Sequence, residues 1–297
     1  MAVTGATGFI GRALCRRLND LGLPVRALVR RARAELPGGV TRVHGSLADP
    51  GALAELVRDA RVVIHCAGTV RGANRAAFDA VNVDGTAALI EAMSEQAPTA
   101  RLVLLSSLAA REPKLSDYAV SKRAAEALLT PGLPFEHCIL RPTAVYGPGD
   151  VELQPLLTAM ARGVAPVPGR PDHRVTLIHV DDLVDALIAA ATRAPGPGPF
   201  ELADDRADGY RWPELAAAVG ARSKRRVWLL PVPAAVLVGL GWINRRLAGA
   251  LGRAPMLTPG KARELLHPDW SCDPRPFRAA TGWAPQHDLA AGLATVL

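Results

Sequence analysis

A tyrosine and a lysine four residues apart are the side chains in this sequence best suited to moving a proton. Tyr118 and Lys122 lie in a stretch that reads as helix, so they share one helical face. A tyrosine with its usual pKa of about 10 is a poor base at neutral pH and needs a neighbouring cation. A unit charge roughly 4 Å away is worth about 4 kcal/mol at an effective dielectric constant of about 20, or about three pKa units. The pair therefore predicts acid–base chemistry, although a surface tyrosine beside a solvated lysine has the same spacing.

A serine pair, Ser106 and Ser107, ends the apolar run 102–105. A buried strand at that run delivers both hydroxyls to the C-terminal edge of a parallel sheet, where open α/β sheets bind their ligands. A hydroxyl at that edge can hold a carbonyl oxygen beside the Tyr118 phenol. The sequence thus predicts a carbonyl-binding group next to the proton-transferring pair.

Three glycines spaced three residues apart lie near the start of the chain. Gly5, Gly8 and Gly11 stand between a short apolar run and an apolar-periodic helix, which is the context of a dinucleotide-binding turn. The first glycine makes the bend, the second lets the backbone approach a pyrophosphate, and the third lets helix and strand pack closely. The helix N-terminus then faces the anion, whereas an ordinary strand-to-helix turn is the alternative. The predicted phosphate contacts are Gly5, Thr7, Gly8, Phe9, Ile10 and Gly11.

The strand predicted at 25–29 ends in a basic cluster, Arg30, Arg31 and Arg33. Folds that prefer NAD usually place a carboxylate at this point, where it binds the ribose 2′-hydroxyl. Arginine instead suits a 2′-phosphate, which it binds through paired charge-assisted hydrogen bonds. The cluster predicts NADP(H), with Arg30 and Arg31 as contacts. NAD(H) is the alternative, and a solvated basic loop would contact neither cofactor.

The order of these features resembles the extended short-chain dehydrogenases/reductases, the NAD(P)-dependent epimerase/dehydratase superfamily. The segment TGATGFIG at 4–11, the serine pair and the Tyr–Lys pair follow one another as in that family. Similar segments continue at 141–149 and 179–183, so the resemblance covers the larger part of the chain. Within the family, the chain looks closest to the hydroxysteroid dehydrogenase and dihydroflavonol reductase branch.

The resemblance implies a role for each residue of the catalytic group. Hydride would pass between the nicotinamide and a carbonyl carbon while Tyr118 exchanges the proton. Lys122 would bind the ribose and lower the tyrosine pKa, and Ser107 would orient the oxygen. Asn82 would have a structural or proton-relay role.

The resemblance also implies further cofactor contacts along the sheet edge. The family usually carries an acidic residue after the glycine that ends the third strand, and Ser46 departs from that pattern. The segment after Arg141, starting at Pro142, would line the nicotinamide side of the cleft. A small-residue loop after the fourth strand would run along the dinucleotide. These further contacts are Ser46, Leu47, Cys66, Ala67, Gly68 and Pro142.

Short apolar runs alternate with helical patterns along the first part of the chain. Such alternation indicates βαβ units and a parallel sheet, with the ligand cleft at the C-terminal ends of the strands. The predicted helices include 11–21, 52–58, 76–95 and 183–191. The predicted strands are 2–4, 25–29, 62–65, 102–105, 135–140 and 174–180, with the last two returning to the same sheet.

We therefore expect an α/β fold, a Rossmann doubly wound parallel sheet with a smaller C-terminal substrate lobe. A connector rich in glycine and proline occupies 194–199, and the βαβ regularity is lost after it. The expected NADP-binding Rossmann domain comprises 1–145 and 172–194. The expected substrate-binding lobe comprises 146–171 and 195–297.

The composition excludes several classes of protein. The 35 basic and 28 acidic residues give a net charge of +7, but the basic residues come in small groups with few aromatic neighbours. This argues against nucleic acid and favours local anion sites or a membrane surface. Four scattered cysteines form neither a zinc motif nor a redox motif, so no metal is expected. The chain shows no secretory signal, so catalysis is expected to face the cytoplasm, and the short first strand suggests a misplaced start codon or a slight truncation.

The segment 227–243 carries no charge and is flanked by basic residues on both sides. Pro231 and Pro233 interrupt it, and it is shorter than the roughly 20 apolar residues of a spanning helix. A buried hairpin or helix in the substrate lobe is one interpretation, and a peripheral membrane contact is the other. Either interpretation suits a small, lipophilic substrate. The sequence leaves a homodimer open.

Three functions compete for this sequence. The first is an NADP(H)-dependent oxidoreductase that interconverts a ketone and a secondary alcohol. The second is an NAD-dependent nucleotide-sugar epimerase or dehydratase, against which Arg30 argues. The third is a non-catalytic accessory subunit that binds a dinucleotide, against which the complete Ser/Tyr/Lys set argues.

Overall fold

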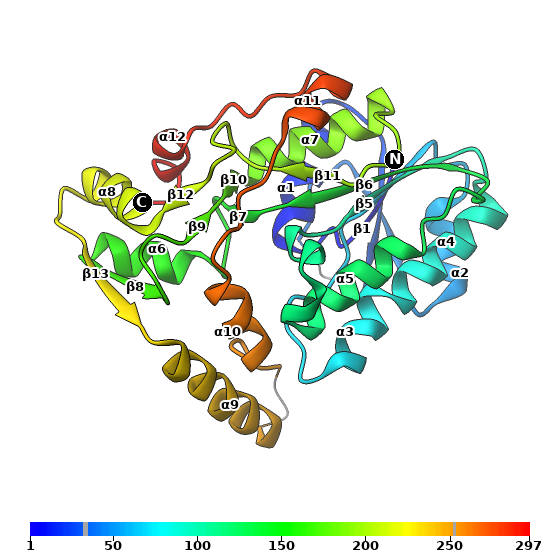
Figure 1. The fold of residues 1–297 in the computed structure, drawn as a ribbon. Coiled ribbons are helices and arrows are strands. Elements are labelled where there is room, and N and C mark those ends of the chain that lie inside the picture. The colour runs from blue at the N-terminus through cyan, green and yellow to red at the C-terminus, as the bar shows by residue number, and fades with distance from the viewer. Residues whose placement is uncertain (32–34, 252–253) are drawn as a thin grey trace.

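A parallel sheet of seven strands forms the centre of this computed structural model (Figure 1). The structure describes residues 1–31, 35–251 and 254–297, so Arg33 of the basic cluster lies outside the described residues. The strands follow the order β11-β6-β5-β4-β1-β2-β3, and all neighbours are parallel. The sheet confirms the predicted Rossmann α/β fold. Its strands are β1 Ala2–Thr4, β2 Val25–Val29, β3 Val40–His44, β4 Val62–His65, β5 Arg101–Leu105, β6 Glu136–Pro142 and β11 Phe200–Leu202.

Helices cover both faces of this sheet, because its strands bury side chains in both directions. In β1, Val3 packs with α1 (Phe9–Asp20) and α7 (Val180–Arg193). The preceding Ala2 faces the other side and packs with α2 (Pro50–Val57) and α4 (Asp84–Gln96). Every residue of β4 is buried. Strands of this kind read as continuous apolar runs, which is why such runs identified them in the sequence.

The strand order reverses between β1 and β4, and this reversal places the cleft. After β3 the chain crosses to the other side of β1 and continues with β4, β5 and β6. At such a reversal the loops after two adjacent strands diverge and leave a crevice for a ligand. The glycine turn after β1 and the loop 66–69 after β4 flank this crevice.

Two predicted strand assignments differ from the structure. The prediction that 174–180 joins the main sheet is wrong, because β10 (Leu177–His179) pairs with β7 (Ala144–Tyr146) in a separate two-stranded sheet. The strand beside β6 is instead β11, from the segment predicted for the second lobe. Both strands have three residues, and so short an apolar run does not specify its partner. The domain limits themselves stay a prediction.

The single helix predicted at 76–95 is also wrong. The structure has two helices there, α3 (Arg75–Asn82) and α4, joined at Val83 with φ −102° and ψ −62°. Asn82 ends α3 with a buried side chain that bonds the loop after β4. The helix-weakening residue closest to the junction is Gly85, two residues after Val83, and a single glycine inside a helical pattern does not specify a helix end.

The second lobe contains short strand pairs with helices around them. β8 (Val164–Pro168) pairs with β13 (Trp228–Val232) in parallel, and β9 (Arg174–Val175) pairs antiparallel with β12 (Tyr210–Arg211). Side chains from α6, β8, α8 and α12 share its core. The remaining elements of the chain are η1 Leu108–Arg111, η2 Pro113–Leu115, α5 Asp117–Ala127, α6 Gln154–Ala161, α8 Trp212–Ser223, α9 Ala234–Ala250, α10 Pro259–Leu266, α11 Arg275–Thr281 and α12 Leu289–Leu293.

The apolar segment 227–243 forms β13 and the first part of α9. The interpretation that it is a buried hairpin or helix is wrong, because Trp228, Leu230 and Trp242 are 61%, 57% and 51% exposed. No helix within the described residues combines the length and the apolar character that crossing a bilayer requires.

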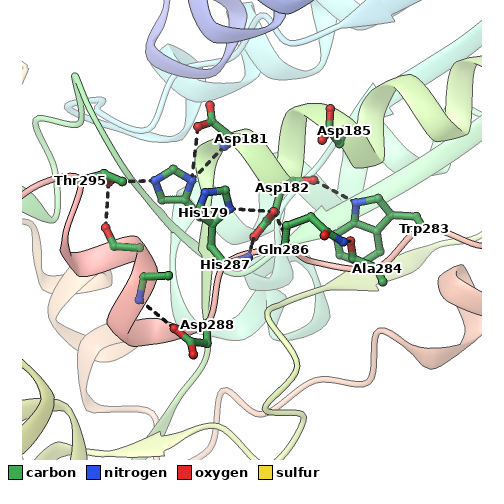
Figure 2. A network of polar contacts seen from close by, with 12 residues as sticks. His179, Asp181, Asp182, Asp185, Trp283, Ala284, Gln286, His287, Asp288 and Thr295 are labelled. Carbon is green, nitrogen blue, oxygen red and sulfur yellow. Dashed lines mark hydrogen bonds and ion pairs between the residues drawn. The ribbon is translucent and has the colours of Figure 1, made fainter.

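A polar network fastens the C-terminal tail to α7 (Figure 2). The buried Asp182 carboxylate accepts the backbone N–H groups of Gln286 and His287 at 2.9 and 3.1 Å. It also lies 2.9 Å from Nδ1 of His287, while its backbone oxygen accepts the indole N–H of Trp283 at 3.1 Å. The tail therefore returns to the Rossmann core, where the Trp283 ring is buried with residues of β1 and α7.

The histidines of this network suggest a metal site at first sight, but their orientation argues against one. Ligand-type atoms of His179, Asp181 and His287 lie within 4.8 Å of one another. The two imidazoles, however, are stacked, with centroids 4.2 Å apart and planes inclined by 28°. Ring-nitrogen lone pairs lie in the ring plane, so stacked rings direct them side by side rather than at one ion. We therefore interpret the network as a structural clasp.

Candidate active site

Helix α5 begins beside the end of β5, and this brings the tyrosine and serine together. Ser116 caps α5, its hydroxyl accepting the N–H of Ala119 at 3.0 Å. Tyr118 follows in the first turn, within hydrogen-bonding reach of the Ser107 hydroxyl. Ser107 itself begins the short helix η1 and accepts the N–H of Ala109 at 3.2 Å. Local capping thus fixes both hydroxyl groups at the C-terminal edge of the sheet.

Lys122 points from α5 toward the predicted cofactor loop. Its Nζ donates a hydrogen bond to the backbone oxygen of Leu105 at 3.0 Å. A Cβ placed on Gly68 would lie 3.1 Å from this Nζ, so the loop after β4 passes directly over the ammonium. Burial lowers the pKa of Lys122 to about 8, against the opposing influence of Cys66 and Glu126. The lysine therefore holds a buried proton close to where a ribose would lie.

Lys122 was expected to lower the pKa of Tyr118, but it is not among the groups that shift this pKa in the structure. Burial raises the pKa of Tyr118 above its usual value of 10.0, and the hydrogen bond with Ser107 is the largest opposing influence. Lys261 on α10 lowers the pKa further, and Glu264 raises it. The physical reason is that Lys122 is directed at Leu105. In this structure Tyr118 is an acid that keeps its proton, which suits donation to a carbonyl oxygen.

Asn82 holds the loop after β4 in place. Its Oδ1 accepts the N–H of Thr69 at 2.8 Å, and its Nδ2 donates to the Thr69 oxygen at 3.1 Å. The same Nδ2 donates to the Ser121 hydroxyl at 2.9 Å, and that hydroxyl donates to the Tyr118 backbone oxygen at 2.8 Å. One buried amide therefore connects the loop with the catalytic helix.

Ser106 and Ser107 have different partners although they are neighbours. Ser106 is buried and donates to Oε1 of Glu126 at 2.5 Å. Glu126 also receives two hydrogen bonds from Arg141, at 2.8 and 2.6 Å. This arrangement leaves the Ser107 hydroxyl as the serine group that faces Tyr118. The sequence analysis did not identify Glu126 and Arg141 as part of the site. A signal for Glu126 was its position one helical turn after Lys122.

The glycine turn has the shape that a dinucleotide phosphate requires. A Cβ on Gly5, whose φ is +70°, would lie 2.5 Å from the backbone nitrogen of Ala67. A Cβ on Gly11 would collide with the Gly5 oxygen, so neither position accepts another residue. Among the described residues no side chain caps α1, which begins at Phe9 after Gly8. The first N–H groups of α1 thus face the crevice and fit an anionic pyrophosphate.

The other predicted cofactor residues lie along the same sheet edge. Arg30 and Arg31 follow β2 and are exposed. The Ser46 hydroxyl accepts the N–H of Ala48 at 3.3 Å, and Leu47 packs against the position of Gly85 on α4. The remaining members are Thr7 and Ile10 at the glycine turn, Cys66, Ala67 and Gly68 after β4, and Pro142 at the end of β6. The residues present therefore fit a nicotinamide dinucleotide laid across the C-terminal ends of the strands, and the individual contacts stay predictions.

A buried histidine links the cradle to α4. His65 at the end of β4 lies 2.5 Å from the Thr4 hydroxyl through Nδ1 and 3.0 Å from the Thr86 hydroxyl through Nε2. Thr86 donates its own hydrogen to the Asn82 oxygen at 2.7 Å, so Nε2 carries the imidazole proton and Nδ1 accepts from Thr4. Burial, with the Lys122 charge, lowers the pKa of His65 to about 3. The structure is built around the neutral imidazole.

Stability should therefore fall in acid partly because of His65. Its pKa of about 3 in the fold lies below the ordinary 6.5, so the unfolded chain binds the extra proton first. The contribution is complete above pH 6.5 and is lost as pH falls toward 3, by at most about 1.4 kcal/mol per pH unit. Between roughly pH 7 and pH 5 we expect a loss of about 2 kcal/mol from this group.

Urea unfolding at the two pH values measures this loss. The variant His65→Gln should have a shallower pH dependence of its unfolding free energy than the wild type. The matched variant His44→Gln changes an exposed histidine and should keep the full dependence. Equal slopes in His65→Gln and wild type would show that His65 does not carry the effect.

A cavity of about 220 Å³ adjoins Tyr118. Phe78 lines it and its ring lies 6.0 Å from the Tyr118 ring, centroid to centroid. Trp242 of α9 and Met256 contribute further apolar walls. The charged residues of the lining are Asp117, Arg245, Lys261, Arg263 and Glu264. Sequence reasoning connected the apolar segment with the substrate but named none of these lining residues. The cavity offers a place for a molecule that has both apolar and polar parts and whose reactive group reaches the tyrosine.

Comparison with known proteins gives one consistent result. Residues 1–203 match the NAD dependent epimerase/dehydratase family. The chain is 42% identical to a ceramide reductase from Caulobacter vibrioides (strain NA1000 / CB15N), over 93% of this chain and 87% of that protein. It is 31% identical to a 2-alkyl-3-oxoalkanoate reductase from Stenotrophomonas maltophilia (strain K279a), over 98% and 96% of the two chains. The solved structure of MoeE5 with UDP-glucose and NAD superimposes with a TM-score of 0.75 at 25% identity, covering 99% of this chain and 95% of that one.

Proposed function

This chain belongs to the NAD-dependent epimerase/dehydratase family and is an NAD(P)-dependent oxidoreductase, and from that premise we propose that it interconverts a ketone and a secondary alcohol on a lipophilic substrate with NADP(H). The observation that carries the proposal is the cavity that opens beside the Tyr118 phenol, with apolar walls from Phe78, Trp242 and Met256. The names of the two relatives, a ceramide reductase and a 2-alkyl-3-oxoalkanoate reductase, support a carbonyl substrate with long alkyl chains.

The side chains divide the work of carbonyl reduction. A bound nicotinamide dinucleotide supplies the hydride. Ser107 donates a hydrogen bond to the substrate oxygen and holds it beside Tyr118. As negative charge develops on that oxygen, the Tyr118 hydroxyl gives it a proton, and the Ser107 hydrogen bond and the Lys261 charge stabilise the phenolate that remains. Lys122 would hold the ribose of the cofactor. In alcohol oxidation the same groups work in reverse order.

A turnover assay tests the reaction class. NADPH absorbance is followed while long-chain ketones, β-keto acids and nucleotide sugars are offered in turn. We expect NADPH consumption with at least one long-chain ketone and none with the nucleotide sugars. Protein that purifies with tightly bound NAD and changes a nucleotide sugar without net consumption of cofactor would replace this proposal with the epimerase alternative.

The preference for NADP(H) is proposed from the two exposed arginines after β2. Arg30 and Arg31 stand where a 2′-phosphate would lie in a fold of this type. A hydrogen bond to a charged group contributes about 1.5–3 kcal/mol, so the double variant Arg30→Ala/Arg31→Ala should raise the Kd for NADPH about tenfold or more. The Kd for NADH should change little.

Fluorescence titration of both cofactors measures this difference. The control Arg61→Ala removes an exposed arginine ahead of β4, at the opposite edge of the sheet, and should leave both affinities unchanged. A parallel loss of NADPH and NADH affinity in the double variant would contradict a 2′-phosphate contact.

A further inference from the structure

Helix α9 has one face against the protein and one face in solvent. Gly241, Asn244 and Ala248 share the inner face, where a Cβ on Gly241 would lie 2.8 Å from the backbone nitrogen of Pro259. The Asn244 side chain donates to the Leu257 oxygen at 3.0 Å, which ties this face to the segment before α10. In Figure 1, α9 lies beside α10 at the margin of the molecule, away from the central sheet.

The outer face of α9 is apolar. Its members recur every three or four residues, which is the spacing of one helical face, and they are 48–69% exposed. They are Val236, Leu240, Ile243, Leu247 and Leu251. If α9 packed this stripe against its own domain, these side chains would not be exposed to solvent.

The stripe belongs to a larger apolar surface. The described residues include fourteen exposed large hydrophobic side chains, and nine of them lie within 228–256. Besides the α9 stripe and Trp242, they include Trp228, Leu230 and Met256, which are 61%, 57% and 49% exposed. Exposed apolar side chains concentrated in one segment on this scale mark an interaction site rather than ordinary surface. We call these nine side chains the apolar surface.

The charge around the apolar surface selects its partner. Between Glu214 and Glu264 the sequence has no acidic residue. Arg226 stacks over the Trp228 ring at 4.0 Å, and Arg245 lies 5.9 Å from the Trp242 ring, so cations border the apolar side chains directly. The basic residues of this interval are Arg222, Lys224, Arg225, Arg226, Arg245, Arg246, Arg253, Lys261 and Arg263. A second copy of the chain would bring the same positive charge against it, whereas an anionic bilayer offers both hydrocarbon and complementary charge.

The apolar surface continues into the cavity at Tyr118. Trp242 and Met256 belong to the apolar surface and also line that cavity, and Arg245 lines it beside them. The cavity and the outer stripe are therefore formed by the same helix and the segment that follows it.

We propose that the apolar surface docks on the interface of an anionic phospholipid bilayer, with α9 lying in the plane of the membrane, and that the ketone enters the Tyr118 cavity directly from the bilayer. Docking follows from the surface alone, whereas substrate entry rests on the proposed function. In the docked position the stripe sinks into the boundary between headgroups and acyl chains while the flanking arginines meet lipid phosphates.

Vesicle binding by the full chain tests the docking. Vesicles of phosphatidylglycerol and phosphatidylcholine in equal parts should sediment the protein, and vesicles of phosphatidylcholine alone should bind it much less. Leu247→Glu places a carboxylate in the centre of the stripe and should weaken binding about tenfold or more. The control Leu21→Glu alters an exposed leucine at the end of α1 and should bind as the wild type does.

A turnover assay tests substrate entry from the membrane separately from docking. A long-chain ketone carried in the anionic vesicles should be reduced about tenfold more slowly by Leu247→Glu, whereas a short water-soluble ketone should be reduced at the wild-type rate. Equal vesicle binding by Leu247→Glu and wild type would overturn the docking. The docking would also be overturned if sedimentation velocity showed a dimer that the Leu247→Glu substitution dissociates. The apolar surface would then contact a second copy of the chain instead of a membrane. If the wild type docks but consumes NADPH with no ketone, the docking stands and the proposed function fails.

Discussion

Replacing Tyr118 by phenylalanine is expected to lower kcat by about a thousandfold, within the range for loss of a positioned general acid. The substitution removes only the hydroxyl that faces Ser107, and the ring keeps its contact with Phe78. Because burial raises the pKa of this phenol, the proton is present at neutral pH and its loss removes the donor itself. The Kd for NADPH should stay near the wild-type value, since the glycine turn and Lys122 are untouched.

Single-turnover kinetics and cofactor titration measure the two halves of this prediction. Tyr210→Phe is the matched control, because it removes a hydroxyl that donates to the buried Asp204 at 2.6 Å in the second lobe. That variant should lose stability but keep its kcat at temperatures where it is folded. A Tyr118→Phe enzyme with wild-type kcat would remove Tyr118 from the mechanism and with it the proposed reduction chemistry.

The placement of the candidate catalytic residues could be predicted because it depends on local sequence, and their roles stay predictions. Tyr118 and Lys122 share a helix, Ser107 ends a strand, and Gly5 and Gly11 occupy a turn that rejects any Cβ. In each case the backbone conformation and the chemical role rest on residues within one or two helical turns. Their assembly then follows from the parallel sheet, which brings the ends of its strands to one edge.

The surroundings of this group could not be predicted, because they depend on contacts between distant segments. Glu126 bonds Ser106 on one side and Arg141 on the other, and nothing near Glu126 in the sequence indicates either partner. Lys261 influences the pKa of Tyr118 from α10 in the C-terminal lobe, far along the chain. The wrong prediction that the segment of β10, rather than β11, joins the main sheet has the same cause. The position of a three-residue strand is determined by tertiary packing and not by its own sequence.

The apolar segment shows a different limit of sequence reasoning. The absence of charge from 227 to 243 predicts that the segment avoids water, but hydrophobicity alone does not say what covers it. In the structure the inner face of α9 packs through the small residues Gly241 and Ala248, and its larger side chains point outward. That inversion, with small residues inside and leucines outside, distinguishes a docking helix from a core helix.

The second large effect is expected from the buried ion pair beneath the catalytic helix. Glu126 and Arg141 are 5% and 6% exposed, and two hydrogen bonds of 2.8 and 2.6 Å join them. Removing one partner leaves the other buried charge with only a weaker neighbour, Glu201 for Arg141 and the exposed Arg123 for Glu126. Glu126→Leu should therefore lower the free energy of unfolding by about 3 kcal/mol. Arg141→Met should cost a similar amount. Urea unfolding at neutral pH measures both losses, and a loss below about 1 kcal/mol would show that water reaches the remaining charge.

The double variant Glu126→Leu/Arg141→Met separates stability from catalysis. Because apolar residues of similar size often replace a buried ion pair without loss, its unfolding free energy should return close to the wild-type value. The ion pair, however, also fixes the rotation of α5 against β6. Glu126 lies one helical turn after Lys122 on α5, and the same carboxylate accepts the hydrogen bond from Ser106. A small displacement of α5 misaligns Tyr118 with the substrate oxygen, so kcat should stay at least about tenfold below wild type. Recovery of both quantities would instead assign the pair to stability alone, since the catalytic helix would then keep its position without the charges.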